Sequence, residues 1–204
     1  ENFQRNFSTG EIEVDGSTIY HKTEYKERRD HYAFYGVNAP INGFDTDRES
    51  FLGLYNGFDE PQVVEAGKPS NSVAMGWSPI ASHYIEVELN PGESKDYVFT
   101  LGYIEMEQSE KFQATTQEDI KKIVDGGLKV STMASPIINK CKAQEVLKKF
   151  DTAAKVDAAF MELRAYWDNL LNIYTVNSGN DKLDRMVNIW NQYQCMITFC
   201  FSRS

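Results

Sequence analysis

The amino-acid sequence predicts an α+β chain in which an antiparallel β-sandwich comes first and helices follow. Residues 1 to about 107 carry alternating side chains and tight-turn dipeptides, which are typical of antiparallel strands with one buried face. From about Thr115 the apolar residues recur at roughly helical spacing. We therefore expect three parts: a partial sandwich domain at residues 1–107, a helical linker at 108–178 and a long helix at 179–204.

The first strands are predicted around a tight-turn dipeptide. Glu11–Val14 and Ser17–His21 flank Asp15-Gly16, a dipeptide that accommodates the positive φ of a short hairpin turn. This spacing predicts a β-hairpin near the start of the chain.

A second hairpin is predicted at the end of the sandwich part. His83–Asn90 alternates in character and stops at Pro91-Gly92, after which Asp96–Glu105 runs back. One face of this hairpin would carry Tyr84, Glu86 and Glu88, and the other Ile85, Val87 and Leu89.

Between these hairpins, Ala33 to Trp77 is expected to be a long ordered loop after its first strand residues. Its glycines and prolines force turns and prevent long regular elements. It also holds aromatic rings that must be buried or used: Phe34, Tyr35, Phe44, Phe51, Tyr55 and Phe58. Long ordered loops of this kind usually serve a site.

Three helices are predicted before the last segment. Thr115 and Glu118 have capping-box spacing, and Gly126-Gly127 would end that short helix. Lys140–Phe150 has one apolar stripe, and Thr152–Tyr174 is an amphipathic helix. The stripe of the latter comprises Val156, Ala159, Phe160, Leu163, Trp167, Leu170, Leu171 and Tyr174.

The last helix is unusual because no charged residue lies between Arg185 and Arg203. At 100° per residue one side holds Leu183, Met186, Trp190, Ile197 and Phe201, and the opposite side Asn188, Asn191, Gln192, Cys195, Ser202 and Arg203. Neutral amides instead of Lys or Glu predict a sheltered polar surface. An inner helix of an α/α toroid fits this pattern better than a membrane span, because buried amides are costly in lipid.

Composition excludes several functions. A net charge of −9 and a pI near 4.9 argue against nucleic acid and anionic membranes as partners. Cys141, Cys195 and Cys200 lack CxxC spacing and are expected to be free thiols in a reducing compartment. With no signal peptide at Glu1, we expect a cytoplasmic protein. The start at Glu1 and the abrupt end at Ser204 suggest a piece of a longer chain.

Scattered histidines and the lack of a metal-binding or phosphate-loop motif predict no metal and no nucleotide site. The acid cluster Asp45, Asp47, Arg48 and Glu49 has two interpretations, which are glycosyl chemistry or caps and ion pairs that hold the loop. Aromatic rings beside amides in the same loop, such as Tyr55-Asn56, could equally stack on sugars or pack the loop.

Arg203 is the strongest candidate for a binding residue. Charge reappears there on the polar stripe, and its planar fork of donors suits phosphate oxygens or sugar hydroxyls. The alternative is a helix-end arginine that faces solvent. Gln192 and Asn191 are weaker companions on the same side.

The irregular loop resembles one family. Three runs carry the resemblance: GVNAPINGFDTDRESFLGLYNGFDEPQVVEAGKPSNSVA, AFMELRAYWDNLLNIY and LDRMVNIWNQYQCMITFCFSRS. In this order they are similar to the cellobiose phosphorylase family, the inverting disaccharide phosphorylases of glycoside hydrolase family 94. These pieces cover roughly half of the chain. The resemblance implies a sandwich domain, a helical linker and the first inner helix of an (α/α)6 catalytic barrel.

The resemblance also implies a reaction. Inorganic phosphate attacks the anomeric carbon of cellobiose, and a carboxylic acid protonates the departing oxygen, giving α-glucose 1-phosphate and glucose with inversion. The general acid would be an Asp beyond Ser204, so no catalytic residue lies in this chain and the fragment alone would be inactive. Phosphate is the co-substrate, and no cofactor is needed.

Other residues and partners follow from the same resemblance. Arg203 would serve the sugar and phosphate site, and Asn38, Asn42 and Asp45 would lie at the rim of the active site of a homodimer. Two other classes of function stay open, namely a non-catalytic carbohydrate-binding sandwich module and a dimerisation domain. Saccharide binding by residues 1–107 alone would favour the first of these.

Overall fold

The computed structural model describes residues 10–23, 30–76, 79–113 and 137–201. It divides into two compact units, Glu1–Ala153 and Ala154–Ser204, and each is treated by itself below. The helix predicted to begin at Thr115 and end at Gly126-Gly127 lies outside the described residues. The predicted domain boundaries at 107 and 178 stay predictions.

The first predicted hairpin is confirmed, with its turn one residue later than expected. Strand β1 (Gly10–Asp15) pairs with β2 (Thr18–Thr23), and Asp15 lies opposite Thr18. The two-residue turn is therefore Gly16-Ser17, and Gly16 has φ 56°. Glycine is needed at this first turn position because other residues rarely adopt a positive φ.

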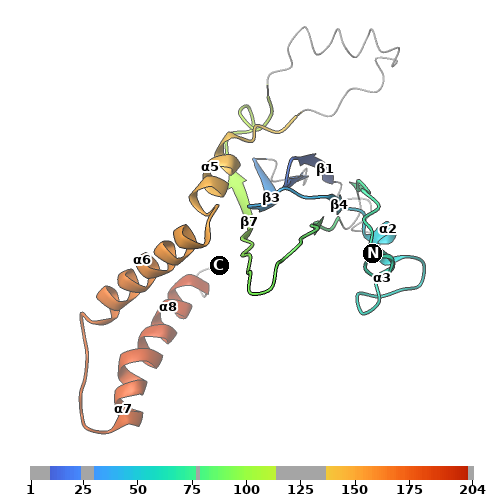
Figure 1. Cartoon of the computed structure of the whole chain (residues 1–204). Coiled ribbons are helices and arrows are strands. Elements are labelled where there is room, and N and C mark those ends of the chain that lie inside the picture. The colour runs from blue at the N-terminus through green and yellow to red at the C-terminus, as the bar shows by residue number, and fades with distance from the viewer. Residues whose placement is uncertain (1–9, 24–29, 77–78, 114–136, 202–204) are drawn as a thin grey trace, which may run out of the picture. The chain divides into compact units, whose positions relative to one another are not determined.

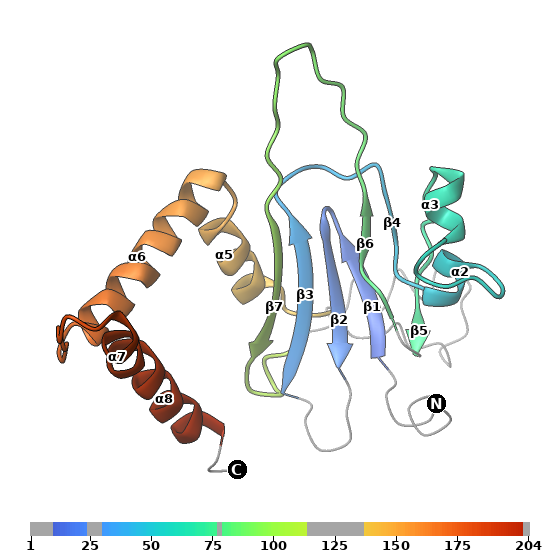
Figure 2. The same ribbon diagram turned by 90° about the horizontal axis from the view of Figure 1, so that it is seen from below.

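This hairpin belongs to a five-stranded antiparallel sheet, of which Figure 1 labels β1, β3 and β7. The strand order is β5-β1-β2-β3-β7 (Figure 2). Strand β3 (His31–Val37) lies between β2 and β7 (Phe99–Glu105), and Tyr35 faces Leu101 across the pair. The short β5 (Met75–Gly76) pairs with β1. Strands far apart in sequence thus lie side by side, as a sandwich layer requires.

The hairpin predicted at residues 83–105 does not form. Its first arm supplies β6 (Ser82–Tyr84), which pairs with β4 (Gly43–Asp45) in a separate two-stranded sheet. Its second arm supplies β7, which pairs with β3. The turn at Pro91-Gly92 is present, but Figure 2 shows the segment between β6 and β7 extending beyond the sheets. A turn signal marks a reversal of the chain without fixing which strands pair. The predicted placing of Tyr84 and Glu86 on one side agrees with the hydrogen bond from the Tyr84 hydroxyl to the Glu86 carboxylate at 3.2 Å.

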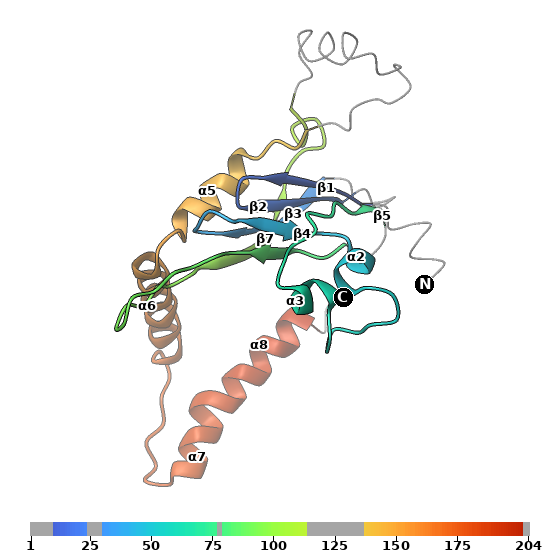
Figure 3. The ribbon, with the colours of Figure 1, turned by 45° about the vertical axis from the view of Figure 1, so that its right-hand side comes forward.

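One face of the five-stranded sheet is covered by α5 (Cys141–Lys149), which confirms the helix predicted over residues 140–150 (Figure 3). Ala143 of α5 is buried, and Val146 and Leu147 pack against the core. Burying these side chains removes apolar surface from water, which is the main stabilising contribution to such a layer. The buried core cluster comprises Tyr20, Tyr32, Phe34, Met106, Ile138 and Ala143.

Two strand glycines allow this close packing. A Cβ at Gly36 would lie 2.7 Å from Cδ2 of Leu147, and a Cβ at Gly102 would lie 2.7 Å from the Phe34 ring. Both distances are shorter than carbon atoms tolerate, so any side chain here would push α5 or Phe34 away.

A charged cluster fixes the start of α5 to the hairpin. Lys140 Nζ lies 2.6 Å from Glu13 and 2.9 Å from Asp15, and 5.4 Å from the centroid of the Tyr20 ring. Burial alone would lower the pKa of Lys140, but the two carboxylates outweigh it and raise the pKa. Glu13 also accepts a hydrogen bond from the Ile138 amide at 3.2 Å.

The other face of the sheet is partly covered by β6. The imidazole of His83 stacks on Tyr35, with ring centroids 5.0 Å apart and planes 9° apart, and lies 6.3 Å from Phe99. Further along β7 the side chains of Leu101 and Tyr103 are 77% and 61% exposed. This face is therefore apolar at its β7 edge and open in the described chain.

The loop between β4 and β5 is ordered and holds two short helices, α2 (Arg48–Leu52) and α3 (Gln62–Ala66). Asp47 caps α2 by accepting a hydrogen bond from the Ser50 amide at 2.7 Å. Gly67 ends α3 with φ 57°, as a left-handed C-cap does. The expectation of an ordered loop is confirmed.

The second unit is helical. Helix α6 (Ala153–Leu171) confirms the predicted amphipathic helix, but half of the eight residues of its apolar stripe are exposed in the described chain, including Phe160 and Leu163. After it come α7 (Asp181–Arg185), the π-helix η1 (Met186–Asn191) and α8 (Gln192–Phe201) in one continuous run. Asn180 caps α7 with hydrogen bonds from the Lys182 and Leu183 amides. The π-helix was not predicted, because its wider turn leaves no distinctive residue pattern.

Candidate functional site

The three predicted rim residues lie in one stretch of the first unit, between the end of β3 and the end of β4. Each makes its hydrogen bonds with a different part of the fold. Their role at the rim of an active site stays a prediction, but their local partners are clear.

Asp45 is buried and holds the loop in place. Its Oδ1 accepts hydrogen bonds from the Ser72 amide at 3.1 Å, from the Ser72 hydroxyl at 2.7 Å and from the Ser70 hydroxyl. Its Oδ2 accepts from the Ser70 amide at 3.0 Å. Burial raises the pKa of Asp45, but these hydrogen bonds from both serines outweigh it and lower the pKa overall.

The rest of the acid cluster is also engaged locally. Asp47 caps α2, and the Arg48 guanidinium carbon lies 5.5 Å from the centroid of the Phe58 ring, a cation–π distance. An ionised, saturated Asp45 has no proton to donate to a leaving oxygen. For Asp45 and Asp47 the geometry therefore favours the interpretation as loop-holding residues over glycosyl chemistry.

Asn42 joins the loop to β6 and the segment after it. Its backbone N–H donates to the Tyr84 carbonyl at 2.8 Å, and its side-chain Oδ1 accepts from the Glu86 backbone N–H at 2.9 Å. The side chain thus extends the pairing of β4 with β6 by one step. Asn42 is held by backbone groups on both sides.

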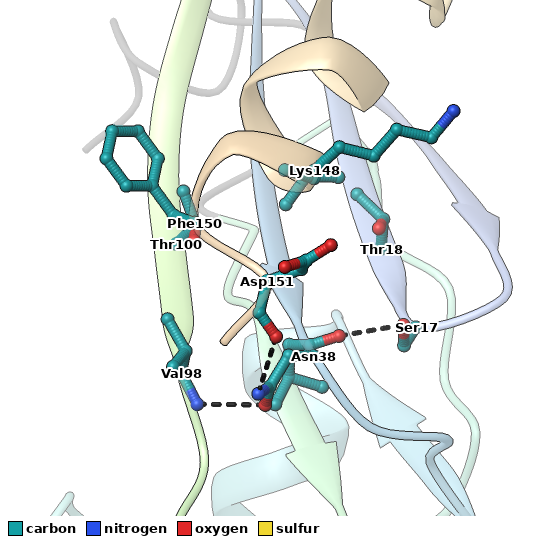
Figure 4. Close-up of a pocket in the computed structure, with 10 residues that line it drawn as sticks. Ser17, Thr18, Asn38, Val98, Thr100, Lys148, Phe150 and Asp151 are labelled. Atoms are coloured by element: carbon teal, nitrogen blue, oxygen red, sulfur yellow. Dashed lines mark hydrogen bonds between the residues drawn. The ribbon is translucent and has the colours of Figure 1, made fainter. Parts of the chain in front are cut away.

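Asn38 joins three segments beside a cavity (Figure 4). Its Oδ1 accepts from the Val98 amide at 2.9 Å, and its Nδ2 donates to the Asp151 carbonyl at 3.0 Å. The end of β3, the start of β7 and the end of α5 are thereby fixed to one another. The cavity beside Asn38 has a volume of about 150 Å³.

Side chains from four separate segments line that cavity. Its polar lining is Ser17, Thr18, Asn38, Thr100, Lys148 and Asp151, and its apolar lining is Val37, Val98, Leu147 and Phe150. Of these, sequence reasoning selected only Asn38. No local motif joins the others, because the hairpin turn, β7 and the end of α5 come together only in the folded chain.

The amide row of the second unit binds a neighbouring backbone. Asn188 donates through Nδ2 to the Val176 carbonyl and accepts through Oδ1 from the Val176 amide, both at 2.8 Å. Gln192 Nε2 lies 3.4 Å from the Tyr174 carbonyl oxygen, which is a weak hydrogen bond. Neutral amides replace charged residues on this side because they must pair with both the donor and the acceptor of a peptide group.

The amide side of the last helix is thus sheltered at two residues, as expected, but the predicted apolar side is largely exposed in the described chain. Asn188 and Gln192 are half-buried against residues 174–176, whereas Leu183, Trp190 and Phe201 on the predicted apolar side are at least 49% exposed. The wider turn of η1 also shifts the phase that a constant 100° per residue assumes. Asn191 is exposed, and Arg203 lies outside the described residues.

Two absences concern only the part of the chain that the structure describes. Within it, no group of three His, Cys, Asp or Glu side chains is arranged to hold a metal ion. Within it, too, every helix is too short or too polar to cross a membrane.

Comparison with known protein families identifies the parts of the chain. Residues 1–127 match the model described as "Glycosyl hydrolase 94, supersandwich domain", and residues 166–204 match "Glycosyl hydrolase 94 superfamily, catalytic domain". The matched descriptions put a sandwich domain before the beginning of a catalytic domain. The chain belongs to the glycosyl hydrolase 94 family, since the first match alone covers more than half of it.

Two curated relatives are both named N,N'-diacetylchitobiose phosphorylase. The protein of Vibrio proteolyticus is 26% identical over 199 residues, and that of Vibrio furnissii is 24% identical over 199 residues. Each alignment covers 97% of this chain and 20% of the relative. The chain therefore spans about a fifth of the length of the curated relatives that it matches.

Proposed function

We propose that this chain is part of an inverting disaccharide phosphorylase. The observation that carries the proposal is the order of the two family matches, with a sandwich domain at residues 1–127 and the beginning of a catalytic domain at 166–204. Both curated relatives are named as phosphorylases, which supports the same class of reaction. A purely binding or dimerising module would not need the second match.

The disaccharide is the open part of the proposal. The loop resemblance supports cellobiose, and the names of the two relatives support N,N'-diacetylchitobiose. The two sugars differ by an acetamido group in place of a hydroxyl on each ring. A site that hydrogen-bonds one of them leaves polar groups unpaired with the other, so one substrate should be strongly preferred.

In the proposed reaction phosphate attacks the anomeric carbon while a carboxylic acid protonates the leaving oxygen. Phosphate replaces both the water and the base of an inverting hydrolase, so a single protein acid suffices. We expect that acid to be an Asp beyond Ser204, with no metal and no organic cofactor. The full enzyme is proposed to be a cytoplasmic homodimer.

The last helical run would be the first inner helix of an (α/α)6 barrel. Its exposed apolar side chains, such as Trp190 and Phe201, would then be covered by other helices of the barrel. Arg203 would present its guanidinium to phosphate or to the glycone sugar, with Gln192 and Asn191 nearby on the same run. Asn38, Asn42 and Asp45 would support the loop at the rim.

The test is phosphorolysis by the longer protein that contains this chain. Sugar 1-phosphate release is measured with cellobiose and with N,N'-diacetylchitobiose, each with inorganic phosphate. We expect one substrate to be used at least about a hundredfold better than the other. Release with neither substrate, or release of free sugar without phosphate uptake, would contradict the proposal.

Arg203 can be tested in the same assay. Arg203→Lys keeps the charge but loses the planar fork, and it should raise the KM for phosphate about tenfold or more. Arg185→Lys is the matched control, because Arg185 is exposed at the end of α7. Residues 1–204 alone should show no phosphorolysis.

A further inference from the structure

The cavity beside Asn38 results from one row of cross-strand neighbours. Thr18 lies opposite Gly36 across the β2–β3 pair, and Gly36 lies opposite Thr100 across the β3–β7 pair. The row therefore carries one hydroxyl side chain on each side of Gly36, which has no side chain. Leu147 packs over Gly36, and the helix ends just beyond it, which leaves the space between the sheet and Asp151 unfilled.

The walls of this cavity are fixed before any ligand arrives. Both polar atoms of the Asn38 side chain are held by backbone groups, and the Ser17 hydroxyl donates to the Val37 carbonyl at 2.9 Å. The Lys140 ion pairs hold the other end of α5 to the same hairpin. The Asn38 and Ser17 side chains are therefore already ordered and lose little conformational entropy when a ligand binds beside them.

The size and chemistry of the lining define the class of ligand. At about 30 Å³ for each water, a volume of about 150 Å³ holds about five water molecules, which suits a ligand of one small ring or less. The lining offers hydroxyls and one carboxylate next to the apolar walls formed by Leu147 and Phe150. The ammonium end of Lys148 points away from Asn38 and Asp151 (Figure 4). Hydroxyl groups bonded to a carbon skeleton match both parts of this surface.

We propose that this cavity, lined by Thr18, Thr100 and Asp151, binds a small neutral polyol, of the size of glycerol to a single sugar ring. The polyol hydroxyls pair with the Thr18 and Thr100 hydroxyls and with the Asp151 carboxylate, and its carbon skeleton contacts the apolar wall. The inference does not depend on the phosphorylase reaction, since every group that it uses belongs to the first unit.

The experiment is a titration of the 204-residue chain with threonine methyl groups labelled for NMR. The probes are glycerol, D-glucose, N-acetyl-D-glucosamine and inorganic phosphate. We expect a neutral polyol to shift the Thr18 and Thr100 methyl signals with saturation, while the signal of Thr46, which is buried in the loop, stays in place. Whichever neutral probe binds most tightly then identifies the size of the ligand.

Variants test whether the shifts report this cavity. Thr100→Val keeps the shape but removes one hydroxyl, and it should weaken binding about fivefold, the equivalent of one neutral hydrogen bond. Thr100→Phe should abolish binding by filling the space. Thr175→Val makes the same chemical change at an exposed position of the second unit and should have no effect. Shifts with phosphate only, no saturable shift with any polyol, or wild-type affinity in Thr100→Phe would each overturn the proposal.

Discussion

Replacing Asp45 by asparagine tests whether this carboxylate holds the loop that the sequence singled out. The side chain is 1% exposed, and it accepts hydrogen bonds from Ser70 and Ser72. The substituted side chain would keep one carbonyl oxygen, which can still accept from Ser72. Its NH2 group would replace Oδ2 and would meet the Ser70 amide, so that one donor faces another.

The expected cost follows from the bonds that change. A hydrogen bond to a charged group contributes about 1.5–3 kcal/mol, and the substitution removes one such bond and neutralises the acceptor of the others. We therefore expect Asp45→Asn to lower the free energy of unfolding by about 2–3 kcal/mol. Asp96→Asn is the control, because Asp96 is exposed in the same unit.

Two measurements decide the outcome. Urea unfolding followed by circular dichroism gives the free energy of unfolding, and hydrogen exchange reports the Ser70 and Ser72 amides directly. Those two amides should exchange faster in Asp45→Asn than in the wild type. Unchanged exchange together with an unchanged free energy would refute the structural role of Asp45.

The pH dependence gives an independent check of the same carboxylate. The folded-state pKa of Asp45 is lowered, so protons bind the unfolded state first as the pH falls. Its contribution to stability is present above pH 3.8 and is lost as the pH falls through the lowered folded-state pKa. The free energy of unfolding should therefore decrease less steeply with falling pH in Asp45→Asn than in the wild type.

Three further predictions concern other parts of the fold. Burial raises the pKa of Tyr32 to about 12, so stability should fall as the pH rises from 10 to about 12, and Tyr32→Phe should flatten this decline in an alkaline unfolding series. Both ring nitrogens of His83 are buried without a hydrogen-bond partner among the described residues, so His83→Phe should raise the free energy of unfolding by about 1–2 kcal/mol. Burial also lowers the pKa of His83, so wild-type stability should decline as the pH falls below 6.5, and less steeply in His83→Phe; an equal slope would contradict this assignment. Asn188→Ala removes both hydrogen bonds to Val176 and should lower the free energy of unfolding of the helical unit by about 1–2 kcal/mol, measured by thermal unfolding. Asn191→Ala changes an exposed residue of the same run and should leave the melting curve unchanged.

Local signals predicted the elements that depend on neighbouring residues. The turn at Gly16, the helix α5, the helix α6 and the helix that starts after Asn180 all follow from turn chemistry, caps and apolar spacing. Each of these features is decided within a few residues of the chain. The irregular loop was predicted for the same reason, because its glycines and prolines exclude long regular elements.

The incorrect predictions concern which segments pair with one another, not where the strands and turns lie. Residues 83–105 contain strand segments and a turn, but β6 pairs with β4 and β7 pairs with β3. Alternation reports that a strand has two different faces and does not report which edge it joins. Similarly, the amides of the last helix predicted a sheltered stripe, yet the group that shelters Asn188 is the backbone of Val176.

The sequence by itself determined the α+β class, the ordered loop, the main helices and the resemblance to a phosphorylase family, because these rest on local chemistry and on an unusual run of residues. Only the tertiary structure decided the strand order, the hydrogen bonds that Asp45 accepts from Ser70 and Ser72, and the cavity beside Asn38. The physical reason is that Ser17, Thr100 and Asp151 are distant along the chain, and they come together only through the pairing of β3 with β2 and with β7 and the packing of α5.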